Sequence, residues 1–232
     1  MKRIGFIIAM EKEKQALMRL FEKSTIEVIR GIEFTKTTYQ GNDIVIALAG
    51  IGKVNAALTT AMLVEHFNPD LIISSGIAGG YDRRLKTLDF VVATSVSYSD
   101  VDAALEGGEV YGQVPGLPFE YKCNYEVIQK IVAEEQIQNV YFGKVLSGDQ
   151  FVSNYDKVNK IVNTHFLDQN VLAFEMELGA VAQVAYLMNV KLLALKCISD
   201  IIGETNLTDY NTFSFAASNK LASLVEQVLN VI

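Results

Sequence analysis

The sequence predicts a single three-layer α/β domain with a mixed central sheet, spanning residues 1–232. Short β-branched runs alternate with helical patterns along the chain, the order that builds a sheet covered by helices. Several runs are apolar at consecutive positions, as expected for strands that are covered on both faces. Because no repeat, low-complexity tract or Pro/Gly-rich linker interrupts these elements, we expect one continuous core.

The individual elements follow from local patterns, taken from the N-terminus. Apolar and β-branched runs predict strands at Ile4–Ala9, Glu33–Tyr39, Ile44–Ala49, Leu71–Ser75, Phe90–Ser95, Val140–Leu146 and Lys191–Ile198. Apolar residues that recur at i, i+3, i+4 and i+7 predict amphipathic helices over Val54–Ala61, Leu178–Ala185 and Leu221–Leu229.

Composition excludes several classes of protein. The formal net charge is −7 and no cluster of Lys or Arg stands out, which argues against nucleic acid and anionic membrane as partners. The only histidines, His66 and His165, have no Cys or second His at metal-ligand spacing, and both lie in polar, helix-like surroundings. We therefore expect neither a metal site nor a Ser-His-Asp triad, and no cofactor.

Cysteine usage and the N-terminus predict a cytoplasmic protein. The two thiols, Cys123 and Cys197, fit a reducing compartment and do not suggest a disulfide framework. The apolar run Ile4–Met10 stops at the charged segment Glu11–Lys14. This run is too short for a signal-peptide core and far short of the roughly 20 apolar residues that span a bilayer.

Chemically unusual residues follow the predicted strands, where ligands usually bind in α/β folds. These segments are Met10–Glu13, Gly76–Gly80, Ser147–Val152 and Ser199-Asp200, with Phe174–Glu177 opening the helix near Leu178. Each segment also has a simpler interpretation. The acids Glu11, Glu13, Glu175 and Glu177 could stabilise the first turns of helices. Gly76–Gly80 could be a tight turn or a cradle for an anion, and Ser199-Asp200 could cap a helix. Together, however, the segments supply separate carboxyl groups that glycosidic cleavage needs as acid, as base and as acceptor for sugar hydroxyls.

Seven short motifs follow one another over nearly the whole chain, from Ile4 to Phe213. They are Gly-x-x-x-Ala-Met-Glu-x-Glu from Gly5, Gly-Ile-Gly-Lys-Val-Asn-Ala from Gly50, Gly-x-Ala-Gly-Gly from Gly76, Gly-Gln-x-Pro-Gly from Gly112, Ser-Gly-Asp-x-Phe from Ser147, Glu-Met-Glu from Glu175 and Ser-Asp from Ser199. In this order they resemble the 5′-methylthioadenosine/S-adenosylhomocysteine nucleosidases of the purine nucleoside phosphorylase superfamily. The resemblance implies a nucleoside phosphorylase-like fold, a homodimer, and hydrolysis of these nucleosides to adenine and the 5′-thio-ribose in methionine salvage.

The resemblance also implies catalytic roles. Glu13 matches the carboxylate that polarises the attacking water. Asp200 matches the acid that protonates adenine N7 as the base leaves, with Ser199 supporting it. Because adenine is a poor leaving anion, a buried acid of raised pKa is needed as the donor at neutral pH.

Substrate contacts are implied in the same way. Glu177 matches the acceptor for the ribose hydroxyls, with Glu175 and Met176 lining the sugar. Phe151 matches the ring that stacks on adenine, and the backbone of Val152 would contact the edge of the base. The pocket for the 5′-thio substituent would be formed by Met10, Ile51, Tyr210 and, from a second subunit, Pro115.

Two single positions and one loop depart from the family pattern. Ile77, in the expected substrate pocket, stands where a small hydroxyl residue is frequent, and Lys196 stands where an Arg is frequent. The loop that starts at Asp100 lacks the usual aromatic residues over Ala103–Glu109 and carries Glu106, Gly107, Gly108 and Glu109 there. We therefore expect looser selection at the 5′-position, and the preferred 5′-group stays open.

Other functions also stay open at this point. A phosphate-dependent nucleoside phosphorylase needs cationic partners for phosphate, and the only arginines are Arg3, Arg19, Arg30, Arg83 and Arg84. A nucleosidase for another 5′-modified adenosine, such as aminodeoxyfutalosine, is compatible with the altered loop. A non-catalytic nucleoside-binding protein would be expected to lack Glu13 or Asp200, and both are present.

Overall fold

The computed structural model describes residues 1–104, 108–204 and 206–232. Its strands are β1 (Arg3–Ile8), β2 (Thr25–Ile29), β3 (Ile32–Tyr39), β4 (Asn42–Leu48), β5 (Leu71–Gly80), β6 (Phe90–Tyr98), β7 (Tyr121–Lys122), β8 (Val140–Ser147), β9 (Val171–Glu175) and β10 (Lys191–Ile201). Its helices are α1 (Glu11–Met18), α2 (Lys53–Phe67), α3 (Glu126–Glu134), α4 (Tyr155–His165), α5 (Leu178–Leu187) and α6 (Asn206–Leu229). None of the helices in these described ranges is both long enough and apolar enough to cross a membrane.

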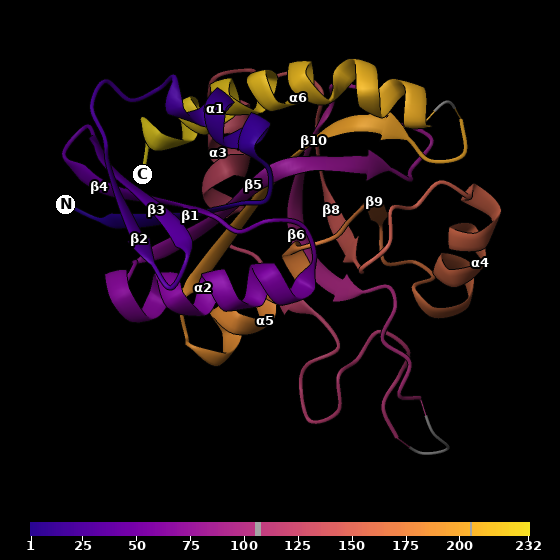
Figure 1. Cartoon of the computed structure of the whole chain (residues 1–232). Coiled ribbons are helices and arrows are strands. Elements are labelled where there is room, and N and C mark those ends of the chain that lie inside the picture. Colours follow the sequence, from indigo (N-terminus) through magenta and orange to yellow (C-terminus); the bar gives the residue numbers. More distant parts are fainter. Residues whose placement is uncertain (105–107, 205) are drawn as a thin grey trace.

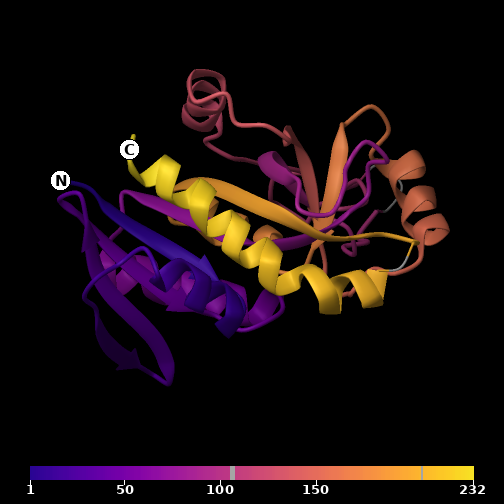
Figure 2. The same cartoon turned by 90° about the horizontal axis from the view of Figure 1, so that it is seen from above.

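The elements form three layers, with one mixed sheet between two layers of helices (Figure 1). Helices α1, α3 and α6 share one buried apolar cluster with the sheet, and α2 and α5 share another on the opposite face. Seen from above, α6 extends along the sheet and packs on β10 (Figure 2). The predicted α/β fold class is thereby confirmed.

Part of the sheet closes on itself. β5 pairs in parallel with β1 on one side and with β10 on the other. From β10 the pairing continues through β6, β8 and β9 and returns to the last residues of β5. These five strands form a closed ring, and β1, β4, β3 and β2 continue from it as an open sheet.

Several strands run past their predicted ends, and in β5 and β10 the extension corrects the interpretation of a motif. β5 runs past Ser75 through Gly76–Gly80, so this segment is not a tight turn. β10 runs through Ser199-Asp200, which therefore does not cap a helix. Glycine is depleted in strands, so a glycine-rich segment resembles a turn unless something must approach the backbone closely.

Candidate active site

A cavity of about 300 Å³ lies near the C-terminal ends of β1, β5, β9 and β10. This volume is within the range of small-molecule sites. Apolar side chains dominate the wall, and the charged side chains that line it are Glu13, Glu175, Glu177, Lys196 and Asp200. The topology thus gathers in one enclosure carboxyl groups that are far apart in the sequence.

Glu13 reaches the cavity from the first turn of α1. Its Oε1 accepts a hydrogen bond from the backbone N–H of Ile77 at 2.9 Å, and its Oε2 accepts one from the N–H of Met10 at 3.0 Å. A Cβ atom on Gly76 would lie 2.9 Å from Glu13 Oε1. Gly76 is therefore the residue that lets this carboxylate lie against β5.

Asp200 reaches the cavity because β10 is irregular at this point. The register with β5 shifts between Ile198 and Asp200, which is a bulge. In a regular strand Ser199 and Asp200 would point to opposite faces, but here both line the cavity. Ser199 Oγ donates to Asp200 Oδ1 at 2.6 Å, and a Cβ on Gly79 would lie 3.3 Å from Asp200 Oδ2.

Glu175 and Lys196 form a buried ion pair beside these groups. Lys196 Nζ lies 3.0 Å from Glu175 Oε2, and the two side chains are 4% and 2% exposed. The same oxygen accepts from the backbone N–H groups of Glu177 and Leu178, at 3.1 and 2.8 Å. Within the described residues, Glu175 Oε1 is buried without a hydrogen-bond partner. Since buried polar atoms are normally paired, this oxygen is suited to accept a hydrogen bond from a ligand.

Glu177 completes the set of acidic groups from the N-terminal end of α5. Its Oε1 accepts from the N–H of Gly52 at 2.8 Å, just before α2 begins. Gly52 has φ of +97°, a conformation that favours glycine, so the backbone can present its N–H here.

Burial controls the ionisation of these groups. Burial raises the pKa of Glu13 above its ordinary range, although the hydrogen bond from Ile77 opposes the shift. Burial and the nearby Glu175 carboxylate raise the pKa of Glu177 to about 7. Burial alone would lower the pKa of Lys196, but the surrounding carboxylates of Glu175, Glu177 and Glu13 raise it, so Lys196 remains an ammonium.

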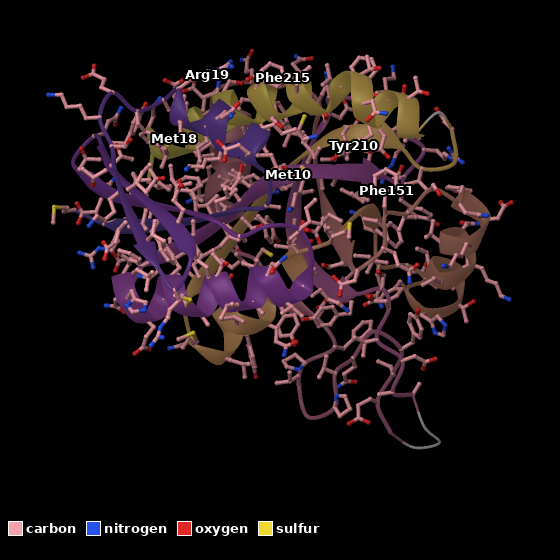
Figure 3. All side chains as sticks on the ribbon, in the orientation of Figure 1. Met10, Met18, Arg19, Phe151, Tyr210 and Phe215 are labelled. Atoms are coloured by element: carbon pink, nitrogen blue, oxygen red, sulfur yellow. The ribbon has the colours of Figure 1, made fainter. Side chains whose placement is uncertain are left out.

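One part of the cavity wall is formed by aromatic and sulfur-containing side chains, Met10, Phe151 and Tyr210, which lie close together (Figure 3). The hydroxyl of Tyr210, from the start of α6, donates to Met10 Sδ at 3.4 Å. Phe151 meets the Tyr210 ring edge-on, with 5.4 Å between ring centroids, and is 49% exposed. A half-exposed ring at a cavity opening offers a face on which a flat ligand can stack.

A polar network connects the loops beside the cavity. Lys53 Nζ lies 2.9 Å from both carboxylate oxygens of Asp100, and the N–H of Asp149 donates to Asp100 at 2.9 Å. The N–H of Lys53 in turn donates to Asp149 Oδ1 at 2.8 Å. The segment before α2 and the segment after β8 are therefore held together next to Phe151.

The structure brings most of the predicted site residues together, while their roles stay predictions. The cavity is lined by Met10, Glu13, Ile51, Ile77, Phe151, Glu175, Met176, Glu177, Ser199, Asp200 and Tyr210. Val152 lines an adjoining hollow that shares Phe151 with the cavity. Pro115 is exposed and outside the cavity of its own chain. Glu106 and Gly107 of the altered loop lie outside the described residues.

Two features of the site were not predicted from the sequence. Lys196 belongs to the charged cluster of the cavity. It lies two and four residues before Ile198 and Asp200 on β10, and this alternation could have placed Lys196 on the same face as Asp200. The N–H of Gly52 holds Glu177, and only the glycine motif that contains it pointed to this segment.

The chain matches the family model of the phosphorylase superfamily over residues 3–230. It is 36% identical to the 5′-methylthioadenosine/S-adenosylhomocysteine nucleosidase of Bacillus cytotoxicus over 230 residues, with 98% of both chains covered. It is 37% identical to the protein of the same name from Bacillus licheniformis over 232 residues, again with 98% of both chains covered.

Solved structures show the same likeness. The nucleosidase from Neisseria meningitidis, in complex with methylthio-immucillin-A, superposes with a TM-score of 0.92 at 29% identity, with 100% of both chains covered. The Helicobacter pylori nucleosidase with butyl-thio-DADMe-Immucillin-A gives a TM-score of 0.93 at 28% identity, with 100% of this chain and 99% of the other covered.

The raised pKa of Glu177 predicts that Glu177→Gln stabilises the ligand-free protein in a pH-dependent way. Below the ordinary glutamate pKa the side chain is neutral in the folded and the unfolded state, so the substitution gains little. Between that value and about 7, Glu177 is ionised in the unfolded state but still protonated in the folded state, so the free energy of unfolding of the wild type falls as the pH rises. The variant has no ionisable group at this position and does not lose this stability. The difference in melting temperature between the variant and the wild type should grow from pH 5 to pH 8. Glu65→Gln on the exposed side of α2 is the control, and a pH-independent difference for Glu177→Gln would contradict the account.

Proposed function

The chain belongs to the phosphorylase superfamily, and on this premise we propose that it hydrolyses the N-glycosidic bond of 5′-methylthioadenosine and S-adenosylhomocysteine, releasing adenine. Relatives that carry this activity in their names match the chain over 98% of its length at 36% and 37% identity. The observation that carries the proposal is the cavity in which Glu13, Glu177 and Asp200 meet in mainly apolar surroundings.

Water, and not phosphate, is the nucleophile. A bound phosphate needs cationic partners, most often arginine. In the described part of the chain, no arginine lines the cavity. Lys196, which does line it, is already paired with Glu175. Glu13, whose pKa is raised by burial, is suited to accept a proton from water.

The bond between C1′ and N9 breaks as water adds to C1′ from the side of Glu13, which takes the proton of the water. Asp200 gives its proton to N7 of adenine, so the base leaves neutral and the free 5′-thio-ribose remains. Ser199, 2.6 Å from Asp200, orients this acid.

The remaining side chains hold the substrate. Glu177 and the unpaired oxygen of Glu175 accept hydrogen bonds from the ribose hydroxyls, beside Met176. Adenine stacks on Phe151, and the backbone of Val152 contacts its edge.

A second copy of the chain completes the 5′-pocket. Ile51, Val54 and Leu58 are 52%, 78% and 54% exposed, and their spacing places them on one side of α2 and the turn before it. Ile51 also lines the cavity, so this apolar surface continues from its opening. Such a surface is typical of a subunit interface, and the exposed loop with Pro115 approaches the cavity of the partner copy in a homodimer.

The protein acts in the cytoplasm, a placement supported by its cysteines. Cys123 and Cys197 are buried free thiols, and burial raises the pKa of each to about 12. Neither is a reactive thiolate at neutral pH, and unpaired thiols suit a reducing compartment.

Adenine release tests the reaction itself. We expect turnover of 5′-methylthioadenosine and S-adenosylhomocysteine without phosphate, with free sugar as the second product, because no arginine set is present to bind phosphate. Adenosine, inosine and aminodeoxyfutalosine are compared in the same assay, each with and without phosphate. A sugar 1-phosphate formed on addition of phosphate would establish a phosphorylase instead.

The role of Asp200 is tested by changing the leaving group. Asp200→Asn should lose roughly 10²–10⁴-fold in rate with adenine as the leaving group, because the proton donor is absent. The loss should shrink greatly for a 5′-methylthioribosyl substrate that releases 4-nitrophenolate, which needs no proton. Glu13→Gln is the matched comparison, since it acts on water and should lose rate with both leaving groups. Equal losses for Asp200→Asn on both substrates would mean that Asp200 is not the acid.

The dimer is tested by placing a charge in the proposed interface. Leu58→Lys on α2 should shift the protein to monomer in sedimentation velocity at micromolar concentration and lower its activity, because a buried lysine lacks a partner there. Val28→Lys on β2, where Val28 is 64% exposed, is the control and should leave the dimer intact. A fully active wild-type monomer would refute the proposal.

A further inference from the structure

Lys12 lies beside the opening of the cavity, one residue before Glu13. Its Nζ donates to the hydroxyl of Tyr210 at 3.2 Å and lies 4.4 Å from the centroid of the same ring. That hydroxyl also contacts Met10 Sδ, which belongs to a residue of the cavity wall. The ammonium therefore lies within two hydrogen-bond lengths of the Met10 sulfur.

The charge of Lys12 is not used by the fold. Two other lysines are paired, Lys14 on the same helix with Glu33 and Lys53 at the start of α2 with Asp100. Across the described ranges, by contrast, no carboxylate lies within ion-pair distance of Lys12 Nζ. The nearby Glu11 carboxylate instead accepts a hydrogen bond from Gln15 Nε2 at 3.2 Å. A half-buried cation that forms no ion pair within the described residues is available to an external anion.

The position of Lys12 determines which part of a substrate it meets. A small apolar 5′-substituent ends among Met10, Ile51 and Tyr210, inside the cavity. Met10 and Tyr210 line the cavity, and Lys12 contacts the Tyr210 hydroxyl. A longer 5′-substituent that leaves the cavity between these two residues brings its end to Lys12. From this geometry, and resting on the proposed function, we propose that Lys12 is a specificity residue that favours 5′-thioadenosines whose tail ends in a carboxylate.

The expected gain is modest because the pair forms at the protein surface. An exposed or half-exposed ion pair changes affinity by about fivefold at most, and salt screens it. The contact of Lys12 with the Tyr210 ring holds the ammonium in place, so less side-chain freedom is lost when the carboxylate binds. Lys12 also acts on Glu13, whose pKa it lowers slightly against the dominant effect of burial. That influence is the same for every substrate.

The experiment uses two substrates that differ only in charge. One carries a 5′-(2-carboxyethyl)thio group and the other carries its carboxamide, which has nearly the same shape. The measured quantity is the ratio of kcat/KM for the acid over kcat/KM for the amide, because any general disturbance of the cavity cancels in this ratio. Lys12→Met removes the charge and keeps an apolar stem, Lys12→Arg keeps the charge, and Lys130→Met, an exposed lysine on α3, is the control.

We expect the ratio to fall about two- to fivefold in Lys12→Met and to be retained in Lys12→Arg and Lys130→Met. In the unaltered protein the ratio should also fall as salt is raised from low to high concentration, a readout that needs no variant. An unchanged ratio in Lys12→Met, or no salt dependence in the unaltered protein, would overturn the role of Lys12. If neither substrate is cleaved, the proposed function fails, and the ratio of binding constants from calorimetry tests Lys12 separately.

Discussion

The constraint on which this site depends is the burial of several carboxyl groups in one small cavity. Each ionised group loses hydration there, and neighbouring carboxylates repel one another in a medium of low dielectric constant. The fold offsets this with backbone N–H donors from Met10, Ile77 and Gly52 and with the ammonium of Lys196. The compensation is incomplete, as the pKa of about 7 at Glu177 shows. Function is therefore maintained here at the expense of stability, a common balance in active sites.

Main-chain geometry, more than side-chain packing, makes this arrangement fit. Glycines at positions 76 and 79 leave space on β5 that a Cβ would take from Glu13 and Asp200. The bulge in β10 then directs Ser199 and Asp200 to the same side of the strand. The pair of strands β5 and β10 thus provides room for the carboxyl groups and sets their orientation. A substitution at Gly76 or Gly79 would crowd Glu13 or Asp200 although the charged residues themselves are unchanged.

The sequence predicted the parts of the fold that local patterns specify. Strands such as Leu71–Ser75 are apolar and β-branched, so their existence was clear, but their ends were not. β5 continues through Gly76–Gly80, where the glycines leave room for Glu13 and Asp200. This close approach is visible only in the tertiary structure, so the local sequence suggested a turn. β9 was missed because its apolar residues directly precede Glu175 and the helical pattern of α5. The candidate residues came together as expected, yet the pairing of Lys196 with Glu175 depends on neighbouring strands that no local pattern shows.

The closed ring of β10, β6, β8, β9 and β5 has a consequence for how such a protein can change. Glu175 and Asp200 belong to strands of this ring, and each is paired with a residue of a neighbouring strand, Ser147 and Gly79 respectively. Met10, Lys12 and Tyr210, in contrast, belong to α1, its N-cap and α6, which lie on the outside of the sheet. Substitutions at the rim can therefore alter which molecules are accepted while Glu175 and Asp200 keep their positions. Glu13 is the exception, because it shares α1 with Lys12 and is affected by changes to that helix.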